Sequence, residues 1–123
     1  MPTKHKILIV DDEVNILMSL EYLLRKKGYE VFIARNGTEA LRIAAAERPA
    51  LVLLDIMMPD VDGYEVCTHL KADEHHAPRV IFLSAKSKKS DIEKGYEVGA
   101  DLYLLKPFST RELTKEIEHI LNN

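Results

Sequence analysis

The sequence predicts an α/β fold, a (βα)5 doubly wound parallel sheet, from three observations. Five short apolar runs recur along the chain, and each has the length of one strand. The segments between these runs carry apolar residues at helical spacing, and capping side chains stand near their starts. Such alternation predicts right-handed crossovers and a single sheet with helices on both faces.

The five apolar runs are the predicted strands. All but the second are apolar on both faces, which is typical of a covered parallel sheet, and the second has the character of an edge strand. We expect the spatial order 2-1-3-4-5, in which strand one lies beside strand three. The runs are ILIV (7–10), VFIA (31–34), LVLL (51–54), VIFL (80–83) and LYLL (102–105).

Capping residues and apolar spacing predict the helices. In NILMSLEYLLRKKG (15–28), Ile16, Leu20, Leu23 and Leu24 fall on one face, and Gly28 can end the helix. Later helix starts are predicted where a capping side chain precedes a glutamate by three residues, as in a capping box. These pairs are Asn36 with Glu39, Asp62 with Glu65, Ser90 with Glu93, and Ser109 with Glu112. Cys67 is expected to be a small buried residue of the third helix.

Length and composition restrict the classes of protein that fit. At 123 residues the chain has the size of one domain, so we expect a single domain over 1–123. The formal net charge of −3 argues against nucleic-acid binding by this chain, because such binders usually carry a basic face. One cysteine excludes an internal disulfide. The start, MPTKHKILIV, has too short an apolar stretch for a signal peptide or a membrane span, so we expect a cytoplasmic protein.

Polar residues follow the predicted strands at the edge where an open parallel sheet places its active site. Because the carboxyl ends of parallel strands meet at that edge, we expect three carboxylates, a hydroxyl and an ammonium group to converge. The residues are Asp11 and Asp12 after the first run, Asp55 after the third, Ser84 and Ala85 after the fourth, and Lys106 after the fifth.

The chemistry of this group favours a metal-assisted phosphoryl site. Three neighbouring aspartates repel one another, and a divalent cation removes that repulsion. Oxygen ligands without a paired histidine or cysteine suit Mg²⁺. A hard cation beside a lysine and a hydroxyl suits phosphoryl transfer, and a carboxylate can itself be the nucleophile. Asp55, flanked by the other groups, fits an aspartate that becomes phosphorylated.

Four motifs, in their order along the sequence, make the whole chain resemble the receiver domain of two-component response regulators, the CheY-like family. The acidic pair stands in ILIVDDE, the phosphoacceptor Asp55 in LVLLDIMMPDVDG, the switch hydroxyl Ser84 in IFLSAK, and the lysine Lys106 in LYLLKPF. The resemblance implies a flavodoxin-like, three-layer αβα fold. It also implies that the protein is a phosphorylation-controlled switch in a phosphorelay. Such a switch is not an enzyme, although it has limited autophosphorylation and autodephosphorylation chemistry.

The resemblance implies a role for each residue of the site. The implied Mg²⁺ ligands are Asp12, Asp55, the backbone carbonyl of Met57 and, partly through water, Asp11. The implied phosphoryl contacts are Ser84, the backbone N–H of Ala85, and Lys106. Tyr103 matches the family's switch aromatic and would enter, from the surface, the space that Ser84 leaves. The Lys106–Pro107 bond is expected to be cis.

The resemblance also implies partners. A histidine on a sensor kinase or on a histidine phosphotransfer protein would donate the phosphoryl group. Phosphorylation would then shift the face made by the fourth helix, fifth strand and fifth helix, where an effector protein or a second copy binds. Candidate contacts on this face are Lys94, Leu102, Arg111 and Lys115. Leu102 stands where the family often has an acidic residue, so we expect an apolar side chain on that face.

Two alternatives stay open at this stage. A small metal-dependent phosphatase or phosphotransferase could use the same aspartate, although no second carboxylate stands two residues past Asp55 and no cap domain encloses a substrate. The receiver could also belong to a longer protein with an output domain.

His75 and His76 match no familiar zinc spacing, and we predict a solvated loop there.

Overall fold

The computed structural model describes residues 4–122 and confirms the predicted α/β fold. Five parallel strands form one sheet in the predicted order, β2-β1-β3-β4-β5. Each predicted apolar run lies within one of them. The strands are β1 (Lys6–Val10), β2 (Glu30–Ala34), β3 (Leu51–Leu54), β4 (Arg79–Ser84) and β5 (Leu102–Leu105).

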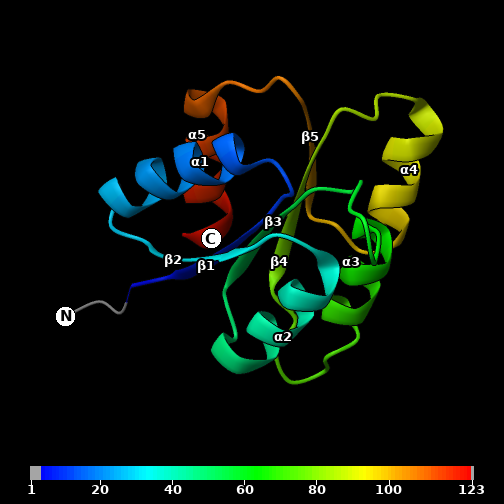
Figure 1. Ribbon diagram of the computed structural model, residues 1–123, viewed down its shortest axis with the longest axis horizontal. Helices are drawn as coiled ribbons and strands as arrows, with labels where there is room; N and C mark the ends of the chain where they lie inside the picture. Colours follow the sequence, from blue (N-terminus) through cyan, green and yellow to red (C-terminus); the bar gives the residue numbers. More distant parts are fainter. Residues whose placement is uncertain (1–3, 123) are drawn as a thin grey trace.

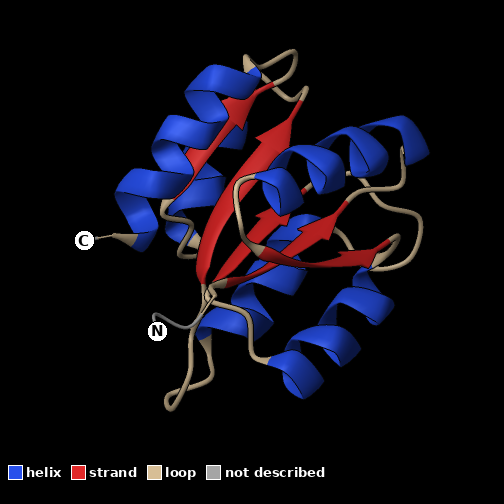
Figure 2. Cartoon of the chain, turned by 90° about the vertical axis from the view of Figure 1, so that its left-hand side faces the viewer, coloured by secondary structure: helices blue, strands red, loops and turns tan. Residues whose placement is uncertain are grey.

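Helices cover both faces of the sheet and complete the three αβα layers (Figures 1 and 2). One face carries α1 (Val14–Lys26) and α5 (Thr110–Leu121), and the other carries α2 (Gly37–Glu47), α3 (Gly63–Lys71) and α4 (Lys89–Glu97). Among residues 4–122, no helix has the length and apolar character that crossing a membrane requires.

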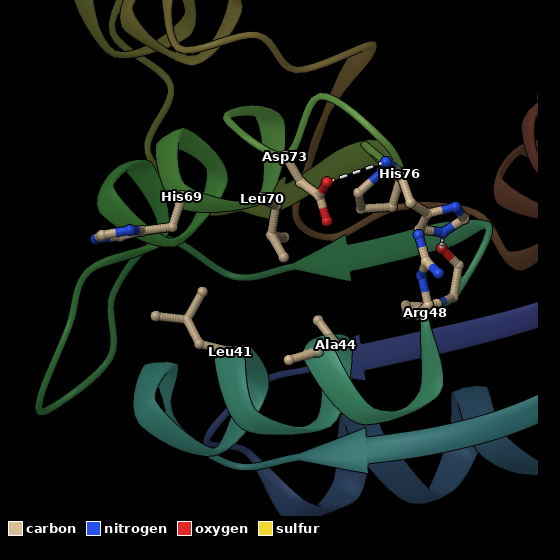
Figure 3. A pocket seen from close by; sticks show the side chains of 10 residues that line it. Leu41, Ala44, Arg48, His69, Leu70, Asp73 and His76 are labelled. Carbon is tan, nitrogen blue, oxygen red and sulfur yellow. Dashed lines mark hydrogen bonds between the residues drawn. The ribbon is translucent and has the colours of Figure 1, made fainter.

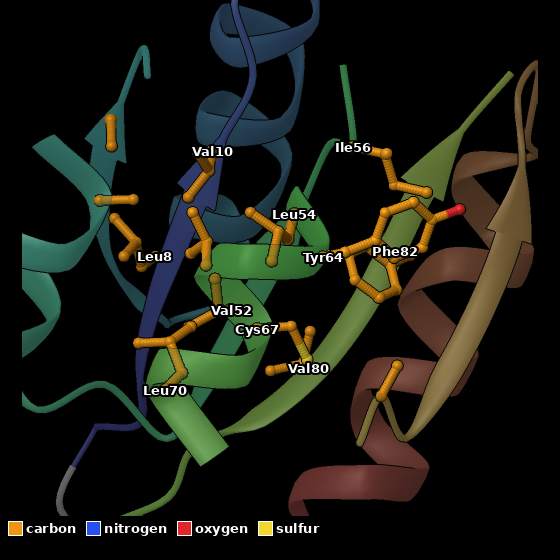
Figure 4. Packing of buried hydrophobic residues seen from close by; sticks show 14 of the residues in the cluster. Leu8, Val10, Val52, Leu54, Ile56, Tyr64, Cys67, Leu70, Val80 and Phe82 are labelled. Carbon is orange, nitrogen blue, oxygen red and sulfur yellow. The ribbon is translucent and has the colours of Figure 1, made fainter. Parts of the chain in front are cut away.

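Alternation along each strand divides the core into two clusters. In β3, Leu51 and Leu53 pack with side chains of α1 and α5, while Val52 and Leu54 pack with those of α2 and α3. Figure 4 shows the second cluster, in which Cys67 of α3 is buried as predicted. Burying an aliphatic side chain of this size contributes about 1.5–3 kcal/mol. The sheet is therefore a firm base for the loops at its carboxyl edge.

Three of the four predicted capping side chains begin a helix. Asn36, Asp62 and Ser109 each accept a hydrogen bond from the backbone N–H three residues further on. Gly28, just after α1, has a positive φ of 97°, which a glycine adopts without a steric penalty.

The prediction that Ser90 caps a helix was wrong. Helix α4 begins at Lys89, its N-cap is Lys88, and no side chain caps it. The backbone N–H groups of Asp91 and Ile92 both donate to the Lys88 carbonyl, so Ser90 lies inside the first turn and not at its start. A serine inside the first turn has the same sequence spacing to a glutamate as a capping serine does, which is why the pattern misled.

Candidate functional site

The sheet register brings the predicted site residues to one edge. The Asp55 N–H donates to the Val10 carbonyl at 2.9 Å, which places Asp55 beside the end of β1. The Lys106 N–H donates to the Ser84 carbonyl at 2.8 Å, which joins the ends of β4 and β5. The Lys106–Pro107 peptide bond is cis, as expected. Side chains far apart in the sequence therefore meet where β1, β3, β4 and β5 end.

Asp11, Asp12 and Asp55 form a carboxylate cluster at this edge. One oxygen atom of each lies within 4.8 Å of the others. Asp11 and Asp55 are buried whereas Asp12 is exposed, so the cluster opens to solvent on one side. Its all-oxygen donor set fits a hard divalent cation such as Mg²⁺, which keeps several waters, better than a metal that prefers nitrogen or sulfur. In the described part of the chain, no other such group of metal-ligating side chains is present.

Lys106 supplies the positive charge of the site. Its Nζ donates to Asp11 at 2.9 Å and lies 3.8 Å from an oxygen of Asp55. Glu13, which the sequence reasoning missed, lies 3.9 Å from the same Nζ. Burial by itself lowers the pKa of Lys106, but the hydrogen bond to Asp11 and the nearby carboxylate charges raise it above its ordinary value. The ammonium is therefore charged at neutral pH.

Asp55 is the carboxylate with the most perturbed environment in this cluster. Burial, followed by repulsion from Asp11, raises its pKa from 3.8 to about 6, although the charge of Lys106 and the Ile56 N–H act in the opposite direction. That N–H donates to Asp55 Oδ1 at 2.8 Å. A group that binds near Asp55 and brings positive charge would favour its ionised form.

Ser84 and Ala85 lie at the end of β4, on the same side of the site. Ser84 is buried, and its Oγ accepts a hydrogen bond from the Lys86 N–H at 3.0 Å. Ala85 is exposed. The short turn after β4 therefore holds a buried hydroxyl at Ser84 and an exposed residue at Ala85.

Tyr103 is buried. The sequence had led us to expect its ring at the surface before phosphorylation. Only 8% of the residue is exposed, and its ring packs against Phe82 with a centroid distance of 5.9 Å. Its hydroxyl donates to the Lys86 carbonyl at 2.8 Å. Gly95 of α4 leaves the space for this ring, because a Cβ there would come within 2.8 Å of it. The inward position thus depends on a glycine that the sequence did not single out.

Met57 is exposed and lies at an open cavity next to the cluster. The cavity has a volume of about 450 Å³ and is bordered by Asp12, Met57, Tyr64 and Lys94 among others. Lys94 lies with its Nζ 4.5 Å from the centre of the Tyr64 ring, a cation–π contact between α4 and α3. Lys94, predicted as a partner contact, thus borders the cavity beside the carboxylate cluster. No sequence signal marked Tyr64 as part of this surface.

A second cavity, of about 380 Å³, lies between α2 and α3 near the opposite edge of the sheet (Figure 3). It is bordered by Leu41, Arg48, Leu70 and His76 among others, and by none of the predicted site residues. His75 is exposed, as expected of a solvated loop. His76 is half-buried instead, because its ring nitrogen hydrogen-bonds with the Pro49 carbonyl oxygen at 3.0 Å.

The remaining candidate partner contacts lie on β5 and α5. Leu102 is half-buried and packs against the α1 and α5 cluster, so the exposed apolar residue of β5 is Leu105 instead. Arg111 and Lys115 are exposed and border a groove shared with α1 residues Leu23 and Lys27.

Curated proteins with similar sequences include two transcriptional regulators. The alkaline phosphatase synthesis transcriptional regulatory protein PhoP of Bacillus subtilis is 45% identical over 116 residues, which is 94% of this chain and 48% of PhoP. The probable transcriptional regulator ycf27 of Porphyra purpurea is 49% identical over 118 residues, which is 96% of this chain and 48% of ycf27. The chain therefore spans about half the length of these relatives.

Solved structures and a family model agree with this similarity. A receiver domain protein (CheY-like) from Methanospirillum hungatei JF-1 superposes with a TM-score of 0.92 at 32% identity, covering 98% of this chain and 95% of that one. The BeF3-activated N-terminal receiver domain of Klebsiella pneumoniae RstA gives a TM-score of 0.89 at 28% identity, covering 96% and 99%. The model of the response regulator receiver domain matches residues 7–118. With this match over most of its length, the chain belongs to the receiver domain family of two-component response regulators.

Proposed function

We propose that Asp55 is the residue of this receiver domain that takes the phosphoryl group, and that Mg²⁺ is required. The observation that carries the proposal is the position of Asp55: it is buried at the end of β3, close both to the carboxylates of Asp11 and Asp12 and to the ammonium of Lys106. A nucleophile there has negative groups nearby that suit a cation and a positive group nearby that suits phosphoryl oxygens.

The proposed donor is a phosphohistidine of a sensor kinase or of a histidine phosphotransfer protein. A carboxylate oxygen of Asp55 attacks the phosphorus atom, the bond from phosphorus to the imidazole nitrogen breaks, and that nitrogen keeps the electron pair and takes up a proton. Asp12, Asp55, the Met57 carbonyl and, through water, Asp11 would hold Mg²⁺. When bound, the cation neutralises charge on the transferred group.

The other residues contact the phosphoryl group. Lys106 would move part of its hydrogen bonding from Asp11 to a phosphoryl oxygen, for which its Nζ needs little displacement. The Ser84 hydroxyl and the Ala85 N–H would donate to the remaining oxygens. A charged Lys106 also keeps Asp55 ionised in spite of its burial, and only the ionised carboxylate is a nucleophile.

The proposed output is binding of an effector protein, or of a second copy, at the α4–β5–α5 face. Phosphorylation adds roughly −1.5 to −2 charges and three acceptor oxygens at one point. Drawing Ser84 towards them would loosen its hydrogen bond with the Lys86 N–H, and Lys86 also accepts from Tyr103. The phosphoryl group and the ring of Tyr103 are therefore linked through one short turn. Since the relatives are named transcriptional regulators, a DNA-binding output domain is the first effector to test.

A metal-dependent phosphatase is the less favoured alternative. Met57, not a carboxylate, stands two residues past Asp55, so no general acid is placed there for turnover. The similar curated proteins are regulators, which favours the switch.

Incubation with acetyl phosphate and Mg²⁺ tests the acceptor. We expect a gain of one phosphate by intact mass spectrometry, with loss of the gain in Asp55→Asn and on chelation of the metal. Asp73→Asn, which changes an exposed carboxylate near the opposite edge of the sheet, serves as the control and should be modified normally. A full gain in Asp55→Asn would place the acceptor elsewhere.

A further inference from the structure

The loop between β3 and α3 carries Met57 and is held at its base. The Gly63 N–H donates to the Ile56 carbonyl at 2.8 Å, which closes the loop just after Asp55. Gly63 has no space for a side chain, since a Cβ would collide with the carbonyl oxygen of Asp55. The two ends of the loop are therefore fixed relative to the phosphoacceptor.

The middle of the loop is anchored to α2 by Asp60. Its two carboxylate oxygens accept the backbone N–H groups of Gly37 and Thr38, each at 2.9 Å. Asn36 accepts the next two N–H groups of the helix. Its side-chain oxygen accepts the N–H of Glu39, and its backbone carbonyl accepts the N–H of Ala40. All four N–H groups of the first turn are thus satisfied, and a residue 22 or 23 positions away satisfies two of them.

Direct contact reinforces this anchor. Gly37 begins α2, and a Cβ there would lie 2.6 Å from the Val61 carbonyl oxygen and 2.7 Å from the Val61 Cβ. The Val61 side chain in turn packs against the core cluster that contains Phe82. The loop therefore rests on the end of α2, with no room between them for even one methyl group.

Met57, Met58 and Pro59 form the segment between the two anchors. All three border the 450 Å³ cavity together with Asp12. The backbone of this segment has no regular structure of its own, so its position depends on Ile56, which the Gly63 N–H holds, at one end and on Asp60 at the other.

We propose that Asp60 is a positioning residue for the phosphorylation reaction: by tying the β3–α3 loop to the first turn of α2, it holds the Met57 carbonyl towards the carboxylate cluster. The inference rests on the proposed function, in which that carbonyl is a ligand of Mg²⁺. Asp60 touches neither the metal nor the phosphoryl group in this scheme and acts through the backbone that it orients.

The chemistry of an aspartate suits this task. Two oxygens on one short side chain match two adjacent N–H groups, and the anion lies at the positive end of the helix dipole. Hydrogen bonds from the Thr38 side chain and then from backbone N–H groups hold the pKa of Asp60 well below its usual range, so the anchor is charged at any working pH. An asparagine would keep one acceptor oxygen and lose the charge.

Asp60→Ala, Asp60→Asn and the control Asn36→Ala, measured by Mg²⁺ titration calorimetry, test the proposal. Asn36→Ala removes a capping hydrogen bond from the same helix end without touching the loop. We expect Asp60→Ala to weaken Mg²⁺ binding by roughly tenfold or more, as the loss of a partner that orients a metal ligand does. Asp60→Asn should lie between Asp60→Ala and the wild type, and Asn36→Ala should bind Mg²⁺ like the wild type.

A metal-free readout accompanies the titration. Amide chemical shifts of Met57 and Met58 should move in Asp60→Ala and stay in place in Asn36→Ala. Should Asp60→Ala not fold, Asp60→Asn carries the comparison. Equal Mg²⁺ affinity in all variants, or equal weakening in Asp60→Ala and Asn36→Ala, would overturn the positioning role. A wild type that neither binds Mg²⁺ nor becomes phosphorylated at Asp55 would instead overturn the proposed function itself.

Discussion

At the scale of single residues, the site combines groups that would be unfavourable one by one. Asp55 is buried next to another buried carboxylate, and Lys106 is the ammonium that both contact. Removing the Lys106 ammonium would leave the two buried carboxylates uncompensated, which costs more than the intact group contributes. The residues of this site are therefore best understood as a unit, and substitutions in it will not have additive effects.

The raised pKa of Asp55 predicts how stability depends on pH without metal. Because the folded-state pKa of about 6 lies above the ordinary 3.8, folding favours the protonated acid. The contribution of Asp55 to the free energy of unfolding is therefore greatest below about pH 4 and is lost as pH rises through 6. Asp55→Asn, which cannot ionise, should exceed the wild type at pH 7.5 by at most about 3 kcal/mol, since one pKa unit corresponds to about 1.4 kcal/mol.

Urea denaturation in the presence of a chelator measures this difference at pH 4 and pH 7.5. The advantage of Asp55→Asn should be much smaller at pH 4, where Asp55 is protonated in the folded chain and only about half ionised in the unfolded chain. A difference of the same size at both pH values would attribute it to packing instead of ionisation.

At the scale of elements, α4 and β5 are joined by contacts that favour the inward ring of Tyr103. The Tyr96 hydroxyl of α4 accepts the Tyr103 N–H at 3.2 Å, and the absent side chain of Gly95 leaves space for the ring. The hydroxyl of Tyr103 then reaches the Lys86 carbonyl ahead of α4. A substitution in α4 should therefore change the conformation of the turn that follows β4.

Gly95→Ala should displace the Tyr103 ring or move α4 away from it, because the added methyl group would lie 2.8 Å from a ring carbon. We expect amide chemical shift changes in β5 and in the turn at Lys86, together with altered binding at the α4–β5–α5 face. Glu97→Ala, an exposed change on the same helix, is the matched control. Identical spectra for Gly95→Ala and the wild type would show that the ring is not held by this contact.

At the scale of the whole molecule, a ligand of the folded edge should stabilise the entire chain. The carboxylate cluster is assembled from β1 and β3, which lie at the centre of the sheet and contribute to both core clusters. Unfolding therefore disperses the cluster, and a cation that binds only the assembled form shifts the equilibrium towards the fold.

Added Mg²⁺ should raise the free energy of unfolding, by about 1.4 kcal/mol at ten times its dissociation constant. Asp12→Ala should lower the Mg²⁺ affinity and remove most of this gain, while folding normally, because it deletes an exposed carboxylate from a repulsive cluster. Thermal unfolding with and without Mg²⁺ measures the effect. An undiminished gain in Asp12→Ala would contradict its assignment as a ligand.

The sequence by itself determined the strands, their order and the residues that meet at the carboxyl edge. Apolar runs of strand length, such as 51–54, carry their own signal because burial on both faces requires apolar residues at every position. Parallel order then places whatever follows each run at one edge, so Asp11, Asp55 and Lys106 could be grouped without coordinates. The start of a helix could be predicted only where a side chain caps it. Ser90 has the sequence pattern of a cap but does not cap α4.

Only the tertiary structure decided the supporting contacts, because these depend on distances across the fold. Nothing near Asp60 in sequence indicates that it serves two N–H groups of α2, and no local pattern indicates that Gly95 makes space for Tyr103. The raised pKa of Asp55 likewise comes from burial and from Asp11, 44 positions earlier in the chain. Local periodicity encodes which face of an element is buried, whereas the contacts that orient a site arise only when several elements have packed together.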